Sequence, residues 1–445
     1  MRFSTLAEWL SFQERLHPVG MDLTLERIAL VADRLGLRDA HVPRTVVVAG
    51  TNGKGTVATR TAALLQAQGL KVGLFTSPHL LRYNERIRID GEPVADDALC
   101  RAFEAIDQAR GEDSLTYFEF GALAAAWLFR EESVAVQVLE VGLGGRLDAV
   151  NIWDADVAAI TAVDLDHQTW LGDSREAIGR EKAGVMRADR PVVLGEAEPP
   201  SSVLEHAARL GAQALRSGQD FTLTRHGATL RWGWQGRMRD WTVEGAGAGI
   251  DGASLLNTAT ALAVVECLGF SEGLTDTVVS QALGVSAPGR LQVVEGAPQW
   301  LLDVAHNVHA VGELARWLEA HPVGGPVVAL VAVMADKERA AMWPRLEGRV
   351  DAWVPVPLEL PRALPAGSLA DELEAAGKRS VVRVPDVAAA IEDATRRAGP
   401  DGRVLVFGSF YTVAAVLEQV PELARAALSG RAVADSQVGE VVHGV

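Results

Sequence analysis

Cysteine is scarce in this chain. Only Cys100 and Cys267 occur among its 445 residues, and both lie in apolar stretches with helical spacing. Two isolated cysteines in such settings are expected to be reduced core residues, as in proteins of a reducing compartment. The sequence therefore excludes a small, disulfide-bonded secreted scaffold.

Long apolar runs and an excess of positive charge are also missing. No apolar run reaches the ~18 residues that a membrane span needs, and Val327–Ala335 is predicted to be a short buried strand. Glu8 and Glu14 stand where a signal peptide would need its apolar core. The net charge of −16 argues against nucleic acid or an anionic membrane as the main partner. It does not exclude an anionic small ligand, whose binding depends on the charge of the local loop rather than on the net charge. We expect a soluble, cytoplasmic protein.

Strand and helix patterns alternate along the chain. The length and the 48% hydrophobic content predict two or three domains with real cores. Apolar runs at 45–49, 72–76, 134–140 and 157–163, with helical patterns between them, predict a mainly parallel α/β sheet of the P-loop type with helices on both faces. Phe221–Val243 alternates polar and apolar residues around three tryptophans, which predicts a small antiparallel patch in which the tryptophans pack.

A second strand–helix alternation begins after a Pro-Gly turn at residues 288–289. We therefore expect a first domain over residues 1–287 and a smaller, Rossmann-like α/β domain over residues 288–445. The sequence contains no internal repeat and no low-complexity tract.

The stretch 45–56, TVVVAGTNGKGT, predicts a buried parallel strand followed by a glycine-rich loop and a helix from Val57. Gly50, Gly53 and Gly55 leave room for backbone N–H groups to converge on a phosphate, and the helix N-terminus adds partial positive charge. Lys54 can neutralise phosphate oxygens, and the hydroxyl of Thr56 is placed to hold Mg²⁺. The spacing departs from G-x-x-x-x-G-K-[ST], and a glycine-rich corner is the alternative. The order of strand, lysine, threonine and helix favours a nucleotide-triphosphate loop.

Polar residues follow the other strands of the predicted sheet, where ligands of open α/β sheets bind. Ser77 ends the second strand, Glu140 closes the third, and Asp164, Asp166 and His167 follow the fourth. A carboxylate beside a phosphate loop suits Mg²⁺, which prefers oxygen ligands. The alternatives are that Glu140 pairs with Arg146 and that His167 is a solvated loop residue. Their shared placement favours a metal–triphosphate centre.

Lys182 lies on the apolar face of a predicted helix that also presents Ile178 and Val185. Asp173 and Glu176 are expected to form a capping box at the start of this helix, which should run to about Arg187. One interpretation is a lysine that reaches to water along its apolar stem. The other is a lysine with a depressed pKa that can be chemically modified. The residues alone leave both open.

Strand ends in the second domain carry polar groups as well: Asp303 to Asn307, Asp336-Lys337, and Gly408 to Tyr411. We expect the two domains to face each other across a cleft with the nucleotide between them.

Eight segments together resemble the folylpolyglutamate synthase/dihydrofolate synthase family of the Mur ligase superfamily. They occur in the family order: GTNGKGT, SPHL-RYNERIRI (77–89), TYFEFG (116–121), LEVGLGGRLDAVN (139–151), DH-x₃-LG with GREKAG (166–184), PGR (288–290), DVAHN (303–307) and DK (336–337). The resemblance covers about residues 20–415, and the spacing of GTNGKGT is the family's own form.

The resemblance implies an ATP-dependent ligase that acts in folate biosynthesis and polyglutamylation. A carboxylate on dihydropteroate or a folyl-glutamate takes the terminal phosphate of ATP, and the amine of L-glutamate then displaces that phosphate. WDADVA (153–158) resembles the bifunctional bacterial form. Implied cofactors are ATP, two Mg²⁺ ions and a carbamylated Lys182, and the implied partners are small molecules.

The resemblance also implies the following roles for matching positions of this chain. The catalytic residues are Lys54, Lys182, His167 and Glu140. ATP is expected to contact Gly50, Thr51, Asn52, Gly53, Lys54, Gly55, Thr56, Asn257, Arg290, Asp303 and His306. Metal ligands are Thr56, Ser77, Glu140, His167 and carbamylated Lys182; pteroate contacts are Thr116, Phe118, Glu119, Arg146, Asp154 and Ala155; glutamate contacts are His306, Ser409 and Tyr411.

Three alternatives remain beside a bifunctional enzyme that acts as a monomer. A monofunctional folylpolyglutamate synthase would lack the dihydropteroate reaction. A Mur-type peptidoglycan ligase would share ATP, metal and carbamylated lysine, but the ~44 residues before the first strand are too few for a UDP-binding domain. A nucleotide-dependent switch would need the binding residues but not Lys182 or His167.

Overall fold

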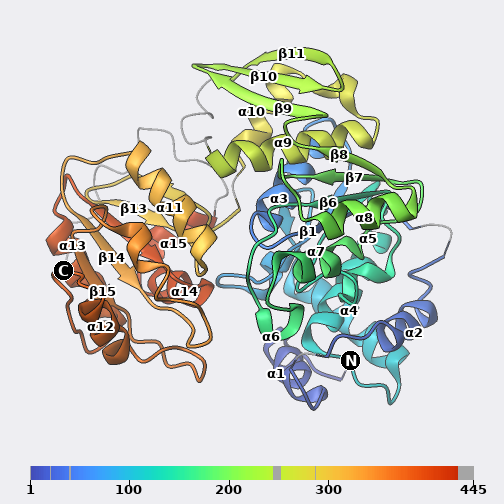
Figure 1. Ribbon diagram of the computed structural model, residues 1–445. Helices are drawn as coiled ribbons and strands as arrows, with labels where there is room; N and C mark the ends of the chain where they lie inside the picture. The colour runs from blue at the N-terminus through green and yellow to red at the C-terminus, as the bar shows by residue number, and fades with distance from the viewer. Residues whose placement is uncertain (1, 21, 40–41, 244–251, 286, 429–445) are drawn as a thin grey trace. The chain divides into compact units, whose positions relative to one another are not determined.

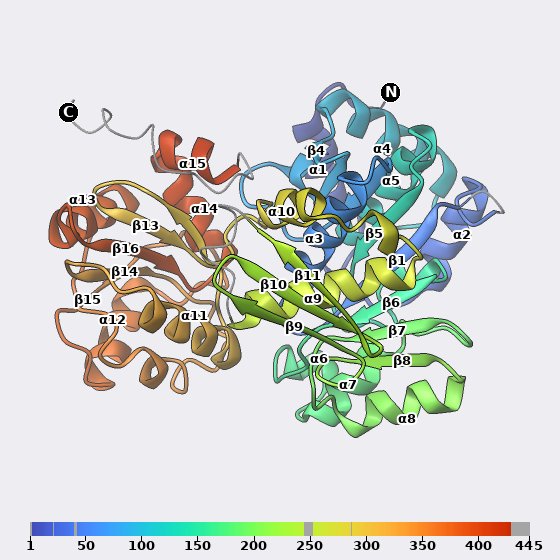
Figure 2. The same ribbon diagram turned by 90° about the horizontal axis from the view of Figure 1, so that it is seen from above.

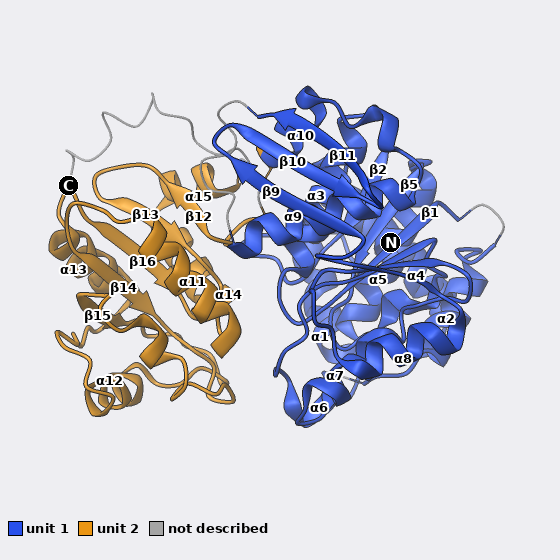
Figure 3. Ribbon diagram, turned by 45° about the horizontal axis from the view of Figure 1, so that its top comes forward, with its two compact units in different colours: residues 1–283 blue, residues 284–445 orange. Residues whose placement is uncertain are grey.

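The chain folds into two compact units, Met1–Leu283 and Gly284–Val445 (Figure 3). A computed structural model describes residues 2–20, 22–39, 42–243, 252–285 and 287–428. The division falls between Leu283 and Gly284, whereas the predicted boundary follows residue 287. The Pro-Gly turn at 288–289 therefore belongs to the start of the second unit.

Unit 1 is built on an eight-stranded sheet in the order β4-β3-β2-β5-β1-β6-β7-β8. The central strand β1 (Arg44–Ala49) pairs in parallel with β5 (Val136–Glu140) and with β6 (Val157–Ile160), so that Val48 lies opposite both Glu140 and Ala159. The remaining strands are β2 (Val72–Phe75), β3 (Ile87–Ile89), β4 (Glu92–Pro93), β7 (Pro191–Leu194) and β8 (Gln213–Arg216). Only β3 runs against the direction of the others, and it pairs antiparallel with both β2 and β4. The predicted mainly parallel sheet is confirmed, and its register brings the loops after β1, β5 and β6 to one edge.

Helices cover both faces of this sheet (Figures 1 and 2). Val47 and Ala49 of β1 belong to the core cluster on one face, because side chains alternate along a strand. That core is completed by helices α1 (Leu6–Leu16), α2 (Glu26–Arg34), α4 (Asp96–Arg110), α5 (Tyr117–Glu131), α7 (Arg175–Ala183) and α8 (Ser201–Leu210). The other face packs against α3 (Lys54–Gln66) and α9 (Gly252–Cys267), and α10 (Asp276–Leu283) packs on α3. Short helical turns occur at α6 (Gln168–Leu171), η1 (Tyr83–Arg86), η2 (Ala149–Ile152) and η3 (Ser271–Gly273).

The predicted antiparallel patch is a three-stranded sheet of β9 (Phe221–His226), β10 (Thr229–Trp234) and β11 (Arg237–Thr242). Helix α9 lies between this small sheet and the large one (Figures 1 and 2). Trp232 and Trp241 are 1% exposed and donate their indole N–H groups to Glu266 Oε1 (3.2 Å) and to the Leu274 carbonyl (2.8 Å). The prediction that these tryptophans pack is confirmed.

Unit 2 contains a five-stranded sheet in the order β12-β13-β16-β14-β15. Its strands are β12 (Gln292–Val294), β13 (Gln299–Leu302), β14 (Val327–Val331), β15 (Ala352–Pro355) and β16 (Arg403–Phe407), and only β12 runs antiparallel. Its helices are α11 (Val308–Ala320), α12 (Ala366–Ala375), α13 (Val387–Ala398), α14 (Phe410–Gln419), α15 (Pro421–Leu428) and the short η4 (Trp343–Leu346). Val406 of β16 pairs with Leu302 on one side and with Leu330 on the other. The predicted Rossmann-like α/β domain is confirmed, and the loops after β13 and β16 leave the sheet at one edge.

Two local predictions need correction. Helix α7 begins after Ser174, whose hydroxyl accepts a hydrogen bond from Ala177 N, so the predicted capping box of Asp173 and Glu176 is wrong. The Glu176 carboxylate instead accepts from the backbone N–H groups of Ser201 (3.0 Å) and Ser202 (2.8 Å) at the start of α8. Helix α7 also ends at Ala183 rather than near Arg187.

The structure bears on the predictions about the cysteines and about membrane-spanning segments. Cys100 and Cys267 are free thiols, and Cys100 is buried. Among the residues that the structure describes, no helix is both long and apolar enough to cross a membrane.

Candidate functional site

The glycine-rich loop between β1 and α3 adopts a backbone that depends on glycine. Gly50 has φ 149° and Gly53 has φ 89°. A β-carbon at Gly50 would lie 1.7 Å from Thr161 Oγ1, and one at Gly53 would lie 2.5 Å from Asn257 Oδ1. Side chains at these two positions are excluded both by conformation and by their neighbours.

Hydrogen bonds to the segment after β6 hold this loop in place. The Thr51 hydroxyl donates to the Asp164 carbonyl (2.9 Å) and accepts from Asp164 N (3.0 Å). Thr51 N donates to the Ala162 carbonyl (2.7 Å), and the Thr161 hydroxyl donates to the Asn52 carbonyl (2.6 Å). These hydrogen bonds define the backbone conformation of the loop, which suits recognition of a phosphate.

Lys54 and Thr56 lie in the first turn of α3, because the helix begins three residues before the predicted Val57. Lys54 Nζ donates to the carbonyls of Gly50 (3.0 Å) and Thr51 (3.3 Å), which places its charge over the loop. The first turn contains no acidic residue. The partial positive charge of the helix N-terminus is therefore not neutralised by an acidic side chain of that turn and is available to an anion.

Glu140 brings the end of β5 to the same place. This carboxylate is 2% exposed, and its Oε2 accepts from Ser77 N at 3.0 Å. Both of its oxygens lie 3.5 Å from the position that a β-carbon on Gly55 would occupy. Arg146, the alternative partner considered for Glu140, instead pairs with Glu181 (Nη2 to Oε1, 3.0 Å). Glu140, Ser77 and the first turn of α3 therefore meet at one point.

The segment after β6 presents His167 with a left-handed backbone (φ 51°). His167 N donates to Asp166 Oδ1 (2.9 Å), and His167 Nε2 lies 3.9 Å from Asp166 Oδ2. Arg175 and Glu196 hold the same segment from the other side: Arg175 Nε donates to the Val163 carbonyl (2.8 Å), and Val163 N donates to Glu196 Oε1 (3.3 Å). Burial raises the pKa of Glu196 to about 7.

Lys182 is 3% exposed on α7, with Ile178 and Val185 also buried. Burial lowers the pKa of its amine to about 7, and the charge of Lys54 lowers it further, while Asp166 and Asp148 act in the opposite direction. Of the two interpretations left open by the sequence, the structure therefore rejects a lysine that reaches to water. The amine is buried, and its pKa lies well below the usual value of a lysine.

Asp148 is a buried carboxylate near both lysines. It accepts from Leu143 N (2.9 Å) and Val150 N (3.1 Å), and burial raises its pKa to about 6 although Lys54 opposes the shift. Asp148 lies within the LDAVN segment, but no pattern in the sequence distinguishes it from its neighbours. Its burial and its proximity to Lys54 and Lys182 emerge only from the fold.

The predicted pteroate residues divide into accessible and buried ones. Thr116 and Glu119 form the capping box of α5, and Glu119 also accepts from Arg27 Nε at 2.9 Å. Glu119 is 3% exposed and Ala155 is 2% exposed, so neither has appreciable surface to offer a ligand. Phe118 is half-buried and lies against Gly142, where a β-carbon would be 2.7 Å from its ring.

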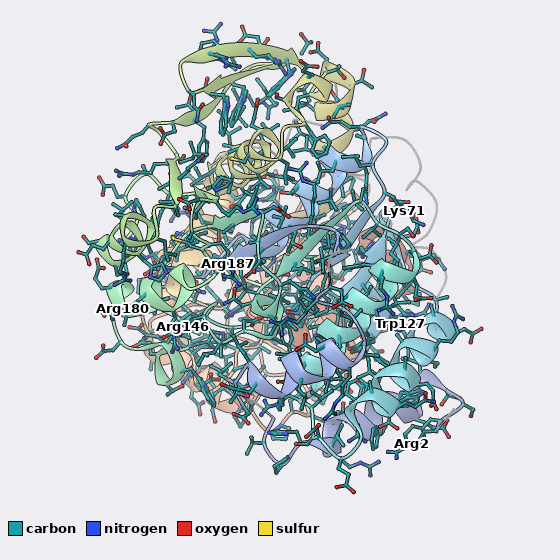
Figure 4. The ribbon with its side chains drawn as sticks, turned by 90° about the vertical axis from the view of Figure 1, so that its right-hand side faces the viewer. Arg2, Lys71, Trp127, Arg146, Arg180 and Arg187 are labelled. Carbon is teal, nitrogen blue, oxygen red and sulfur yellow. The ribbon has the colours of Figure 1, made fainter. Side chains whose placement is uncertain are left out.

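Arg146 and Asp154 are exposed. Asp154 pairs with Arg187, whose guanidinium also donates to the Asn151 carbonyl at 2.8 Å. Arg146, Arg180 and Arg187 lie on the same part of the surface of unit 1 (Figure 4).

In unit 2, Asp303 organises the turn that carries Arg290. Its Oδ2 accepts from Leu291 N and its Oδ1 from Ala305 N, both at 2.7 Å. The Arg290 guanidinium lies 5.0 Å from the centre of the Phe410 ring.

The predicted glutamate contacts in unit 2 have different settings. His306 Nδ1 lies 2.8 Å from the Val304 carbonyl. Ser409 is buried as the N-cap of α14 and bonds to Thr412, whereas Tyr411 is 56% exposed.

Comparison with known proteins gives one consistent result. Residues 289–410 match the family model of the Mur ligase, glutamate ligase domain. The dihydrofolate synthase/folylpolyglutamate synthase of Escherichia coli K12 is 42% identical over 425 residues, which cover 94% of this chain and 96% of that protein. The chain belongs to the dihydrofolate synthase/folylpolyglutamate synthase family.

Solved structures of family members agree. E. coli FolC in complex with DHPP and ADP superposes with a TM-score of 0.86 at 40% identity, covering 95% of this chain and 99% of that one. A bifunctional folylpolyglutamate synthase/dihydrofolate synthase with Mn, AMPPNP and L-glutamate bound gives 0.84 at 44% identity, with 94% and 98% coverage. The predicted membership is confirmed, and the protein is an ATP-dependent ligase of glutamate in folate metabolism.

Within unit 1 of this ligase, the fold brings together residues from five separate segments. The phosphate loop, Ser77, Glu140 and Asn257 are joined by contacts described above, and Lys54 and Lys182 influence each other electrostatically. The sequence missed Asp148, Arg175 and Glu196, because no motif known to us marks a residue whose task is to hold a neighbouring loop.

Proposed function

We propose that this family member is bifunctional and joins L-glutamate both to dihydropteroate and to folyl-glutamates. The observation that supports this most strongly is the meeting of a preformed phosphate loop with Glu140, Ser77 and the buried amine of Lys182 at one sheet edge. A loop with Lys54 at a helix N-terminus, beside an acidic oxygen donor, suits the transfer of a phosphoryl group to a carboxylate.

The proposed reaction has two steps. A carboxylate oxygen of the pteroate or folate attacks the γ-phosphorus of ATP, and the bond to the β-phosphate oxygen breaks to release ADP. The amine of L-glutamate then attacks the carbonyl carbon of the acyl phosphate, loses a proton and expels inorganic phosphate. Lys54 and the N-terminus of α3 neutralise the phosphate charge that is moved in both steps.

Divalent metal is assigned to Thr56, Ser77, Glu140, His167 and Lys182. Four of these offer oxygen or imidazole donors as they stand, and the buried carboxylate of Glu140 at Gly55 fits a hard cation. Bound Mg²⁺, of which we propose two ions, would supply charge neutralisation to the phosphates.

Lys182 fits the proposed carbamate. A buried amine with a pKa of about 7 is neutral often enough to react with carbon dioxide, and the product would carry negative charge beside Lys54. Carbamylation removes the penalty of burying an ammonium and leaves oxygen donors in its place.

Substrate contacts are proposed for residues of both units. ATP contacts include the phosphate loop and Asn257 in unit 1 and Arg290, Asp303 and His306 in unit 2. Thr116, Phe118, Arg146 and Asp154 are assigned to pteroate, with Glu119 and Ala155 supporting this site from inside. Glutamate is assigned to His306, Ser409 and Tyr411. We further propose a cytoplasmic monomer without nucleic-acid or membrane partners.

Release of ADP separates the candidate functions. Glutamate-dependent release with dihydropteroate, and none with UDP-muramyl precursors, is the expected result. Turnover with a reduced folyl-monoglutamate but not with dihydropteroate would indicate a monofunctional folylpolyglutamate synthase. Turnover with UDP-muramyl precursors would indicate a peptidoglycan ligase, and ATP binding without any ligation would indicate a switch.

A further inference from the structure

Arg60 is a buried cation in the helix that follows the phosphate loop. The residue is 7% exposed, and its guanidinium faces α9. Nη1 donates to the Ser254 carbonyl and to Thr258 Oγ1, both at 2.6 Å, and Nη2 donates to Ser254 Oγ at 2.9 Å. All three acceptors are neutral and belong to one turn of α9.

No carboxylate among the described residues pairs with Arg60, and its Nε has no hydrogen-bond partner there. Burial lowers the pKa of the guanidinium to about 10, and no neighbouring anion counteracts this shift. A buried ion without a counter-ion costs stability, and an apolar side chain of similar volume often packs at least as well. Packing alone therefore gives no reason for arginine at this position.

The geometry of the two helices gives a reason. Ser254, Asn257 and Thr258 are spaced i, i+3 and i+4, so they share one face of α9. Gly53 and Arg60 are two turns apart and share one face of α3. The same helix pair thus carries two contacts: Arg60 with Ser254 and Thr258, and the amide of Asn257 against Gly53.

The hydrogen bonds from Arg60 to Ser254 and Thr258 join α3 to α9 and fix one helix along the axis of the other. A slide of one residue moves a helix by about 1.5 Å, which is enough to displace Asn257 from the phosphate loop. The planar guanidinium, which donates to three acceptors in fixed directions, prevents such a slide.

We propose that Arg60 is a positioning residue for the nucleotide: it locks α9 onto α3, so that the Asn257 amide stays against the phosphate loop. This inference rests on the proposed ATP-binding role of Asn257. Arg60 itself touches no substrate in this proposal.

Arg60→Met tests the proposal in the full-length protein. The Kd for AMPPNP and the KM for ATP should rise at least about tenfold, whereas the KM values for glutamate and dihydropteroate should stay within about twofold. Arg60→Lys keeps the charge but loses the planar guanidinium with its several N–H donors. It should bind AMPPNP as weakly as Arg60→Met. Arg110→Met is the matched control: Arg110 is equally buried, and its partner Asp107 retains an ion pair with Arg2 (3.1 Å). This control should leave all three KM values unchanged.

A double-mutant cycle with Asn257→Ala decides whether Arg60 acts through Asn257. In the Asn257→Ala background, Arg60→Met should weaken AMPPNP binding by less than about twofold. A full tenfold loss in that background would overturn the proposal, as would a parallel rise in every KM or an equal effect of Arg110→Met. If Arg60→Met does not fold, Ser254→Ala with Thr258→Val removes two acceptors and should give the same selective loss. Normal nucleotide binding in that variant would also overturn the proposal.

The proposed function fails independently of this inference. A wild-type protein that binds AMPPNP but joins no glutamate would refute the ligase assignment, while the binding measurements on the Arg60 variants would still decide the role of Arg60.

Discussion

Replacing Lys182 by methionine is expected to abolish ligation and, at neutral pH, to stabilise the metal-free protein. Methionine has a similar length and suits the apolar surroundings of Ile178 and Val185, but it can neither carry charge nor form a carbamate. The substitution therefore separates the free-energy cost of burying the amine from the role of the amine in ligation.

The magnitude follows from the pKa of the amine. Burial lowers it from 10.5 to about 7, and this difference of 3.5 corresponds to about 5 kcal/mol. The wild-type protein loses up to this amount of unfolding free energy at pH 7 and below. We expect Lys182→Met to recover about 3–5 kcal/mol under those conditions.

The sign of the pH dependence is fixed by which state holds the proton. Between pH 7 and 10.5 the unfolded chain binds a proton that the folded chain has released, so the stability of the wild type rises with pH. Below pH 7 both states are protonated, and the cost stays at its full value. The advantage of Lys182→Met should therefore be largest at or below neutral pH and should shrink as the pH approaches 10.5.

Urea unfolding followed by tryptophan fluorescence measures the effect. Both proteins are first freed of metal and carbon dioxide and are compared at pH about 6.5 and about 9.5. Lys71→Met is the matched control, because Lys71 is a surface lysine whose side chain is 39% exposed. Adding bicarbonate with Mg²⁺ should stabilise the wild type but not Lys182→Met, and it should not restore ligation to the variant.

Three results would refute this reasoning. The first is a Lys182→Met protein that is less stable than the wild type at neutral pH. The second is a stability difference that does not change with pH. The third, near-normal glutamate ligation by the variant, would exclude the carbamate role outright.

Three further substitutions test other parts of the site. Glu140→Gln should raise the Mg²⁺ concentration for half-maximal ADP release at least about tenfold, and chelation should stop release altogether; an unchanged Mg²⁺ requirement would remove Glu140 from the metal site. Arg27→Met leaves the buried Glu119 carboxylate without its cation and should cost about 2–4 kcal/mol in urea unfolding, most of which Glu119→Gln should restore. Asp303→Asn can satisfy only one of Leu291 N and Ala305 N, so we expect a loss of about 1–3 kcal/mol and faster hydrogen exchange at whichever amide is left unpaired; unchanged exchange at both amides would contradict the role of Asp303.

The parallel sheet and its phosphate loop could be predicted because their signals are local. Val46, Val47 and Val48 follow one another without polar alternation, as expected for a strand that is buried on both faces. Glycine, lysine and threonine then follow in the order expected of a phosphate loop. By contrast, β7 and β8 extend the sheet without any motif, and the sequence analysis did not predict them.

The failed capping box shows why local signals have a limit. Ser174 and Asp173 are both good N-cap residues, and Glu176 stands three residues after Asp173. Helix α8 decides between them, because its first backbone N–H groups donate hydrogen bonds to the Glu176 carboxylate, which then does not cap α7. That helix is remote in sequence and is brought to α7 only by folding.

The sequence by itself determined which chemical groups are present and where strands end. Those features depend on backbone preferences and motif spacing within a few residues, and they were enough to indicate a metal–triphosphate centre. The ligase activity was indicated only by the resemblance of eight segments to a known family. Tertiary structure decided which charges lose their water. The pKa of Lys182 is lowered and that of Asp148 is raised by segments distant in the chain, because desolvation depends on everything that packs around a group. The hydrogen bonds of Arg60 to α9 likewise join residues that are far apart in the sequence.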